Sequence, residues 1–238
     1  MELVSTDVPV TSATACLPYV HTGTLEGCTD EFSPSGASNI QHTEMLDEGA
    51  VVRKLIVSEF VSLDGVMEAP GGEPGYAHSG WVGDFMGPEQ LQYKLNEVRE
   101  AEALLIGRVT YETFAGAWPA REGEMAEKMN SMPKHVVSST LQNPAWNNTE
   151  VLRGDIPGHV NRLKAEDGGP ILVAGSRTLV HALMADGLVD EYRFMVFPVI
   201  LGSGRRVYPD TPEKTVLELA DTERFPSGVT VLTYEPAS

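Results

Sequence analysis

The sequence predicts a three-layer α/β/α fold, in which a central mixed, mostly parallel β-sheet carries helices on both faces. Two observations support this prediction. Short apolar strands alternate with amphipathic helices along residues 51–238, as expected for a parallel sheet covered on both sides. Residues 171–200 also show one complete unit of strand, turn, helix and strand, for which we expect parallel pairing through a right-handed crossover. The chain of 238 residues, 42% of them hydrophobic, is long enough to bury the core of one such domain.

The elements are expected in a fixed order along the chain. Apolar runs predict strands at residues 54–60, 103–106, 134–137, 171–174 and 192–200. Helical spacing of apolar residues predicts helices at 88–103 and 155–166, and Asp155 is the expected cap of the second. Residues 214–219 and 229–234 alternate in polarity, which predicts that they close the sheet as antiparallel strands.

The helix of the 171–200 unit has recognisable ends. Ser176 is a suitable N-cap residue, directly after the apolar strand and Gly175. Leu179, Val180, Leu183 and Met184 then follow at helical spacing. Gly187 comes just after them, where a helix commonly ends in a residue with positive φ. We therefore expect a helix of about two turns that packs one apolar face on the sheet.

The first fifty residues are expected to lie outside the domain, as a flexible extension or as the product of a start site assumed too early. They show no sustained helical or strand periodicity, and Met45 is an alternative initiator near the start of the domain. Both cysteines, Cys16 and Cys28, lie in this extension. We expect them to be reduced thiols, and no metal site is predicted.

The charge distribution excludes several classes of partner. The chain carries a net charge of −17, and its first fifty residues contain eight acids and no Lys or Arg. Subtracting these eight from 34 leaves 26 acids against 17 bases, a balance of −9, for the rest. Such a surface disfavours nucleic acid and anionic membranes as partners. With no signal peptide and no apolar run of membrane-spanning length, we expect a cytoplasmic protein.

Two strand-to-helix junctions have the composition of phosphate-binding turns. Gly175-Ser176 follows the strand at 171–174, and Gly107-Arg108-Val109-Thr110 follows the strand at 103–106. A helix N-terminus presents free N–H groups and the positive end of the helix dipole to an anion. Each junction could instead be an ordinary turn, in which glycine only relieves backbone strain. Two such junctions on one sheet, however, can hold both ends of a dinucleotide.

Four segments resemble one known family. VAGSRTLVHALMADGLVDEYRFMVFPVILGSGRRVYP is similar to the C-terminal half of the dihydrofolate reductase-like family, in the branch that contains the riboflavin-biosynthesis reductase domain. RKLIVSEFVSLDGVMEAPGG (53–72), EALLIGRVTYETFAGAWP (102–119) and KHVVSSTL (134–141) match in the family's order. The resemblance covers residues 53–208 and, less clearly, continues to the C-terminus. It implies hydride transfer from NADPH to a C=N or C=O bond of a pteridine-, pyrimidine- or carbonyl-type substrate.

The resemblance assigns roles near the first strand. It implies that Asp64 in the Ser62–Gly65 turn faces the nicotinamide end of the cofactor, as the catalytic candidate. It also implies that Ser79 and Arg99 bind substrate and that Trp81 binds cofactor. Each residue has a structural alternative: a side-chain cap of the turn for Asp64, a packing anchor for Trp81 and a helix C-terminal surface residue for Arg99.

The remaining cofactor residues follow the resemblance at three strand ends. They are Gly107, Arg108, Thr110, Ser138, Ser139, Gly175, Ser176, Arg177, Thr178 and Leu179. Hydroxyl groups at Ser138 and Ser139 could bind a ribose 2′-phosphate, which would favour NADPH over NADH. They could equally be solvated turn residues.

Departures from known patterns limit the predicted function. Riboflavin-type reductases carry a substrate-contacting Glu where this chain has Ala174, and neither Asp84 nor Glu89 matches the pteridine-binding carboxylate of dihydrofolate reductases. No GxGxxG follows the first strand, and no HxE with PCxxC is present, so we expect neither a classical Rossmann domain nor an attached deaminase domain. The alternative function is a dinucleotide-binding sensor or scaffold without catalysis.

A homodimer is the expected assembly. The strand at residues 192–200 is apolar on both faces, which predicts that it lies at a sheet edge and packs against a second copy. The alternative is a central strand buried within one chain, since parallel strands are normally apolar throughout.

Overall fold

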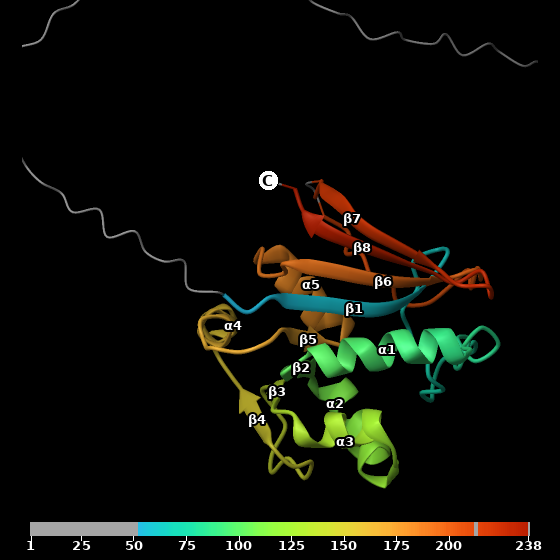
Figure 1. The fold of residues 1–238 in the computed structure, drawn as a ribbon. Coiled ribbons are helices and arrows are strands. Elements are labelled where there is room, and N and C mark those ends of the chain that lie inside the picture. Colours follow the sequence, from blue (N-terminus) through green and yellow to red (C-terminus); the bar gives the residue numbers. More distant parts are fainter. Residues whose placement is uncertain (1–51, 212–213, 238) are drawn as a thin grey trace, which may run out of the picture. The chain divides into compact units, whose positions relative to one another are not determined.

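The computed structural model describes residues 52–211 and 214–237 (Figure 1). The expected N-terminal extension therefore lies outside the described residues, as do its two cysteines. The strands are β1 Leu55–Ser62, β2 Ala103–Gly107, β3 Lys134–Val137, β4 Thr149–Leu152, β5 Ile171–Val173, β6 Glu191–Phe197, β7 Leu217–Arg224 and β8 Thr230–Pro236. The α-helices are α1 Pro88–Glu100, α2 Arg108–Ala117, α3 Glu124–Ser131, α4 Ile156–Lys164 and α5 Arg177–Ala185, and one 3-10 turn spans Trp118–Ala120. None of the described helices is long and apolar enough to cross a membrane.

The strands form one mixed sheet in the order β4-β3-β2-β5-β1-β6-β8-β7. The strands β1 to β6 are parallel, β8 is antiparallel to β6, and β7 at the edge is antiparallel to β8. This confirms the predicted sheet. The expected direct pairing of β5 with β6 is wrong, because β1 lies between them and pairs in parallel with both. The unit of β5, α5 and β6 thus crosses over the first strand of the domain.

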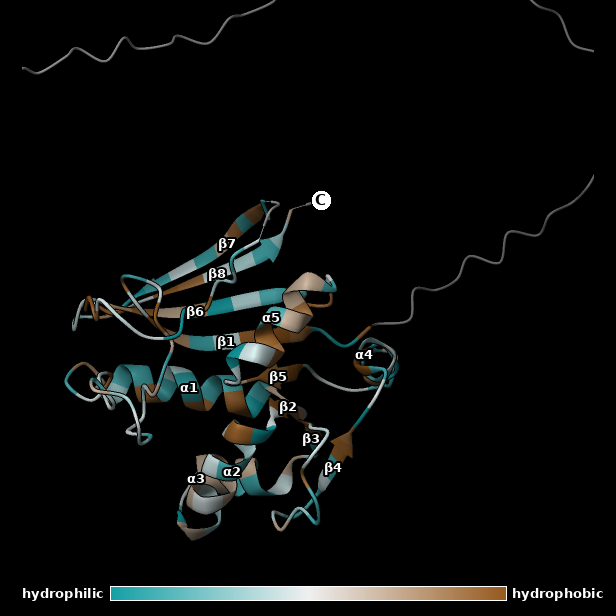
Figure 2. Cartoon of the chain, turned by 180° about the vertical axis from the view of Figure 1, so that it is seen from behind, coloured by the Kyte–Doolittle hydropathy of each residue, from teal (hydrophilic) through white to brown (hydrophobic). Residues whose placement is uncertain are grey.

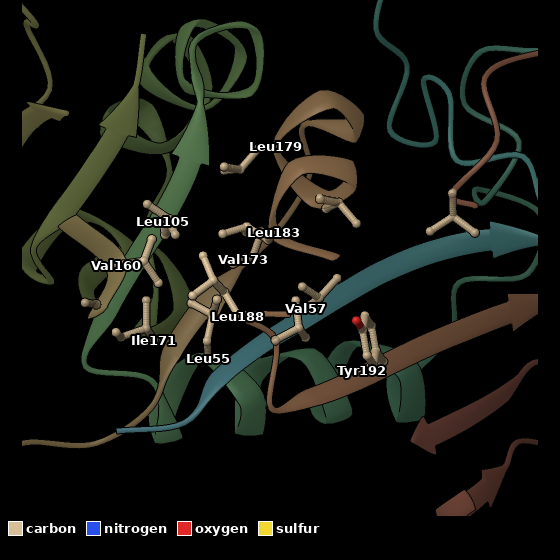
Figure 3. Packing of buried hydrophobic residues seen from close by; sticks show 14 of the residues in the cluster. Leu55, Val57, Leu105, Val160, Ile171, Val173, Leu179, Leu183, Leu188 and Tyr192 are labelled. Atoms are coloured by element: carbon tan, nitrogen blue, oxygen red, sulfur yellow. The ribbon is translucent and has the colours of Figure 1, made fainter. Parts of the chain in front are cut away.

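Helices cover both faces of the sheet. On one face, α4 and α5 pack on the strands through a core that includes Val160, Leu183, Leu55, Leu105 and Val173 (Figure 3). On the other face, α1, α2 and α3 close a second core, which contains Val98, Tyr111, Met129, Ile56 and Ile106. Figure 2, turned by 180° from Figure 1, shows α5 in front of the sheet and the hydrophobic colouring of β5 beneath it. Successive strand residues alternate between the two cores, as the pleat requires.

The helix ends follow local sequence. Asp155 caps α4 as predicted, since its side chain accepts a hydrogen bond from the Gly158 N–H at 3.0 Å. At α1, the Gln90 side chain accepts the Gly87 N–H at 2.9 Å. Gly187 after α5 has φ +63°, which agrees with its predicted role as the residue that ends the helix.

A buried ionic network lies between α1 and the sheet. Lys94 and Glu97 of α1 form an ion pair at 2.5 Å, and both contact the Ser58 hydroxyl of β1. Arg193 of β6 extends the network to Glu191, 2.6 Å away, and to Glu97 at 3.8 Å. Charges buried this deeply need partners, and Glu97 has both a cation and a hydroxyl donor.

The strand β6 is not an edge strand, contrary to the prediction. It pairs with β1 on one side and β8 on the other, and Phe197 at its end is 0% exposed. Its apolar residues are buried within one chain, so the alternative interpretation of this strand is the correct one. A homodimer remains a prediction without an assigned interface.

The strand β7 differs from its predicted bounds, and the strand β4 and the helix α3 had no counterpart in the prediction. The strand β7 begins at Leu217 rather than at residue 214, and it runs on through polar residues to Arg224. It is an edge strand that is exposed along most of its length and has a register shift between Leu219 and Asp221. The strand β4 and the helix α3 were not predicted. Both are short, and β4 lies at the other edge, where little apolar periodicity is required.

Candidate functional site

The candidate site lies at the carboxyl ends of β2 and β5, which are neighbours in the sheet. The helix α2 leaves β2 toward one face, whereas α5 leaves β5 toward the opposite face. Chains that diverge in this way from adjacent parallel strands mark the topological switch point, where ligands of open α/β sheets bind. The topology alone therefore points to the two junctions that the sequence singled out.

The two junctions are joined by the side chain of Ser176. Its hydroxyl oxygen accepts the Gly107 N–H at 3.0 Å and lies 2.8 Å from the Thr110 hydroxyl. Ser176 occupies the N-cap position of α5, as predicted, but its side chain makes no capping hydrogen bond. Ser176 instead connects the β5–α5 junction (residues 174–178) to the β2–α2 junction (residues 107–110).

Close approach of the two junctions depends on both glycines. A Cβ atom at Gly107 would lie 2.4 Å from the Ser176 Oγ, and one at Gly175 would lie 3.1 Å from the Thr110 side chain. Gly175 has φ +84°, and Ser176 itself has φ +78°, a conformation that costs energy for a residue with a Cβ. The β5–α5 junction is thus held in a strained geometry by its surroundings.

Two helix N-termini meet at this point. The first intrahelical acceptor of α5 is the Ser176 carbonyl, which receives the Val180 N–H, so the N–H groups of Arg177, Thr178 and Leu179 precede the helical ladder. The side chains of Arg177 and Thr178 are exposed, whereas Leu179 is buried in the core and can offer only its backbone. These donors suit an anionic group such as a phosphate.

The end of β3 extends the site along the same edge. Val137 of β3 is paired with Gly107, so Ser138 follows beside the β2–α2 junction. The Ser138 hydroxyl accepts the N–H groups of Thr140 and Leu141, at 3.1 and 2.9 Å, and thereby shapes the turn. Ser139 is exposed and Arg108 is paired with Glu112 at 2.8 Å. The structure brings these residues to one edge of the sheet.

Asp64 connects two loops at the carboxyl ends of β1 and β6. Its carboxylate accepts hydrogen bonds from the Ser62 hydroxyl at 2.7 Å and from the backbone N–H groups of Leu201 and Gly202, at 3.1 and 2.9 Å. The hydrogen bond from Ser62, followed by the two backbone donors, lowers the pKa of Asp64 to about 2. An ionised, fully engaged carboxylate is a poor proton donor. It holds the 62–65 turn onto the 201–202 loop.

Trp81 anchors the long loop between β1 and α1. Trp81 is 8% exposed; its ring packs edge-to-face on Phe197 with centroids 5.4 Å apart and donates its indole N–H to the Glu68 carbonyl at 2.8 Å. Ser79 donates its hydroxyl to the Glu73 carbonyl within the same loop. In this structure the contacts of Trp81 are therefore those of a packing anchor, the structural alternative to a cofactor-binding role.

Arg99 lies away from the other candidate residues. It belongs to the last turn of α1, which leads into the amino end of β2, whereas the junctions lie at the carboxyl ends. There it forms a two-pronged ion pair with Glu124 of α3, with distances of 2.5 and 2.6 Å. This position matches the structural alternative of a basic residue near a helix C-terminus.

Glu59 is a site residue that the sequence reasoning missed. It lies on β1 opposite Gly175, where β5 has already ended, and its carboxyl group accepts the Gly175 N–H at 2.8 Å. Its side chain is buried, with 6% of the residue exposed. Burial raises the pKa of Glu59 to about 8, with smaller opposing effects of the Gly175 N–H and of Lys94. In the sequence, the signal that could have identified Glu59 was an acidic residue in the middle of an otherwise apolar strand.

Two cavities lie elsewhere, beside α1 and the β7–β8 hairpin. One of about 330 Å³ is lined by residues that include Tyr93, Arg193 and Thr233, and one of about 490 Å³ by residues that include Pro88 and Tyr93. Neither cavity is lined by a residue of the two junctions. Within residues 52–211 and 214–237, no group of His, Cys, Asp and Glu is arranged to hold a metal ion.

Comparisons with known proteins show the family to which the chain belongs. A family model described as the RibD C-terminal domain matches residues 53–231. The uncharacterized protein YyaP of Bacillus subtilis is 30% identical over 188 residues, which cover 76% of this chain and 94% of YyaP. YwjB of the same organism is 25% identical over 177 residues, which cover 74% of this chain and 95% of YwjB.

Solved structures share the fold. A putative riboflavin biosynthesis protein from Shewanella sp. PV-4 superposes with a TM-score of 0.62 at 19% identity, covering 78% of this chain and 99% of that one. A pyrimidine reductase-like protein from Corynebacterium diphtheriae gives a TM-score of 0.57 at 12% identity, covering 78% and 92%. At these identities the likeness concerns the fold, which is the one predicted from the sequence.

Proposed function

Because the chain belongs to the RibD C-terminal domain family, we propose that it is an NADPH-dependent reductase that transfers hydride to a C=N or C=O bond of a small pteridine-, pyrimidine- or carbonyl-type molecule. The observation that carries the proposal is the bridge from Ser176 to Gly107 and Thr110. It brings two helix N-termini together at the switch point of the sheet, where a dinucleotide with several phosphate charges would find donors on both sides.

The residues present fit a phosphorylated dinucleotide. Gly107 and Gly175 allow the two junctions to approach each other, since a Cβ at either would meet Ser176 or Thr110. The free N–H groups at the starts of α2 and α5 are suitable phosphate donors. Arg108 and Arg177 are exposed at these two helix starts and supply positive charge in an otherwise acidic protein. When bound, reduced nicotinamide would supply the hydride.

The chain's own residues would bind and orient the two reactants. Ser138, at the end of β3, shapes the turn that carries the exposed Ser139, so a 2′-phosphate is the group that this end would favour. The loop held by Trp81 and by the contacts of Asp64 forms part of the same edge and is suited to exclude water. Ser79 lies on this loop as a substrate-binding candidate.

A second candidate function is dinucleotide binding without catalysis, as a sensor or scaffold. Asp64 favours it, because its carboxylate is ionised and committed to loop contacts. Ala174 also stands where the riboflavin-type reductases carry a substrate-binding carboxylate. Binding without any turnover would support this second function.

One experiment separates these proposals. Binding of NADPH and NADH is measured by fluorescence titration, and oxidation of NADPH is followed with dihydrofolate, a ribosylaminopyrimidine and simple carbonyl compounds. Saturable binding with turnover on one class supports the reductase, and saturable binding without turnover supports the sensor. Absence of binding to either dinucleotide contradicts both.

A further inference from the structure

The least expected group at the junctions is the buried carboxyl of Glu59. Glu59 lies on β1 beyond the last residue of β5, so on that side it faces the backbone of the turn, whereas on the other side it pairs with Phe194 of β6. It accepts the Gly175 N–H at 2.8 Å, and Gly175 is followed directly by Ser176. Glu59 therefore fixes the peptide that sets the position of the Ser176 hydroxyl.

A chain of contacts runs from Glu59 through both junctions. The carboxyl group holds Gly175, and the Ser176 hydroxyl then reaches Gly107 and Thr110. Three strands of the sheet, β1, β5 and β2, are thereby linked at their carboxyl ends. A change at Glu59 would be transmitted to the helix N-termini that face a bound anion.

The surroundings of Glu59 favour its neutral form. The charged groups that act on it electrostatically are Lys94 and Glu97 of α1, which contact Ser58 on the other face of the sheet and form an ion pair with each other at 2.5 Å. Among the described residues, Glu59 itself has no ion pair, and its contact on the β5 side is the Gly175 N–H. A carboxylate without a counter-ion in such a site is costly, so the proton is retained to a higher pH than usual.

We propose that Glu59 is a positioning residue that links the binding of an anionic cofactor at the β5–α5 junction to the uptake of a proton. The inference rests on the proposed function. An ionised Glu59, bound to the Gly175 N–H only two residues before the first free N–H group of α5, would repel a bound phosphate. Neutral Glu59 holds the same peptide without that repulsion, so binding and protonation favour each other.

The consequences are measurable without turnover. In the wild-type protein, the affinity for NADPH should fall at least about threefold between pH 7 and pH 9, as Glu59 ionises. At pH 8, binding should take up roughly half a proton for each cofactor bound, because Glu59 is then about half ionised before binding. The Glu59→Gln variant keeps an oxygen that can accept the Gly175 N–H but cannot ionise, so both effects should disappear.

The test is isothermal titration calorimetry with NADPH in two buffers of different ionisation enthalpy, from pH 7 to pH 9. Glu191→Gln is the matched control, since Glu191 is another buried carboxyl but lies at the amino end of β6. This control should retain the wild-type proton uptake. Equal uptake in wild type and Glu59→Gln would overturn the inference while leaving the proposed function intact. Absence of dinucleotide binding by the wild type would overturn both.

A second measurement uses the cofactor-free protein, in case Glu59→Gln folds poorly. The carboxyl ¹³C resonance of Glu59, assigned by comparison with Glu59→Asp, is titrated by NMR. A midpoint well above that of an ordinary glutamate supports the inference, and an ordinary midpoint contradicts it.

Discussion

The backbone N–H of Gly107 donates to the hydroxyl of Ser176 at 3.0 Å, across two adjacent strands of the sheet. This contact leaves no room for a side chain at residue 107, since a Cβ there would lie 2.4 Å from the Ser176 Oγ. It also uses a donor at the N-terminus of α2 that could otherwise face a ligand. The two junctions therefore behave as one unit, and changes at either should affect both.

Gly107→Ala should destabilise the protein by about 1–3 kcal/mol, because the new methyl group displaces Ser176. The same change should weaken dinucleotide binding. Gly116→Ala is the control, since Gly116 lies in α2, the helix that follows Gly107, with no neighbouring atom within 4 Å of its added Cβ. That control should be neutral or stabilising by up to about 1 kcal/mol. Urea unfolding measures the free energy of unfolding of both variants. Equal changes in the two variants would show that the contact between Gly107 and Ser176 contributes little to stability.

Asp64→Asn should destabilise the protein at pH 7 by about 1–3 kcal/mol, because hydrogen bonds to a charged acceptor are replaced by weaker ones. The pKa of Asp64 is lowered in the folded state, so its contribution is present above about pH 4 and is lost as the pH falls toward 2. The difference between the two proteins should therefore shrink on acidification. Denaturant unfolding at pH 7, 4 and 3 measures the difference in free energy of unfolding between the two proteins. A difference that does not change with pH would contradict this explanation.

Glu59 should give the opposite pH dependence. Its pKa is raised to about 8 in the folded state, so between about pH 4.5 and 8 the folded protein retains a proton that the unfolded chain has released. The free energy of unfolding should fall across that range by at most roughly 1.4 kcal/mol per pH unit, and then level off. Glu59→Gln should show a flatter profile in the same urea series. Parallel profiles of the two proteins would be inconsistent with the raised pKa.

Trp81→Ala should cost about 3–5 kcal/mol, because a buried ring packed on Phe197 is replaced by a cavity. Trp81→Phe keeps an aromatic ring but loses the hydrogen bond to the Glu68 carbonyl, so about 1 kcal/mol is expected. Thermal unfolding compares the two variants. A mild effect of the alanine change would mean that the loop is not anchored by this residue.

Arg108→Ala should reduce the preference for NADPH over NADH, since a charge-assisted contact to a phosphate contributes about 1.5–3 kcal/mol. Arg108 must leave Glu112 to make that contact. Arg121→Ala is the control, because Arg121 stacks on Trp118 just beyond the C-terminal end of the same helix. Fluorescence titration with both cofactors measures this preference. An unchanged ratio of the two affinities would show that Arg108 does not bind the 2′-phosphate.

The sequence predicted the architecture well, because buried parallel strands and amphipathic helices leave strong periodic signals. The position of β6 was missed for the same reason. An apolar strand looks alike whether it is central or at an exposed edge, and only pairing with β1 and β8 distinguishes the two. The second half of β7 was missed because an exposed edge strand needs no apolar alternation.

The candidate site was predicted only in part. Glycine and hydroxyl residues after a strand identified both junctions, since that composition has a local physical cause. The partners of these residues depend on tertiary contacts. Glu59 is 116 residues from Gly175, and Ser176 is 69 residues from Gly107, so no local pattern reveals either hydrogen bond. Arg99 was assigned by resemblance, and the direction of α1 carries it to the opposite end of the sheet.

The exposed strand β7 has a consequence for the behaviour of the protein at high concentration. An open strand edge can recruit a strand of another molecule and so start aggregation. Here the edge carries Glu218, Asp221 and Glu223, and its register shift between Leu219 and Asp221 interrupts a regular ladder. Both features oppose the addition of a further strand, although Leu219 is 56% exposed. Salt screens such charges, so this protection should weaken as ionic strength rises.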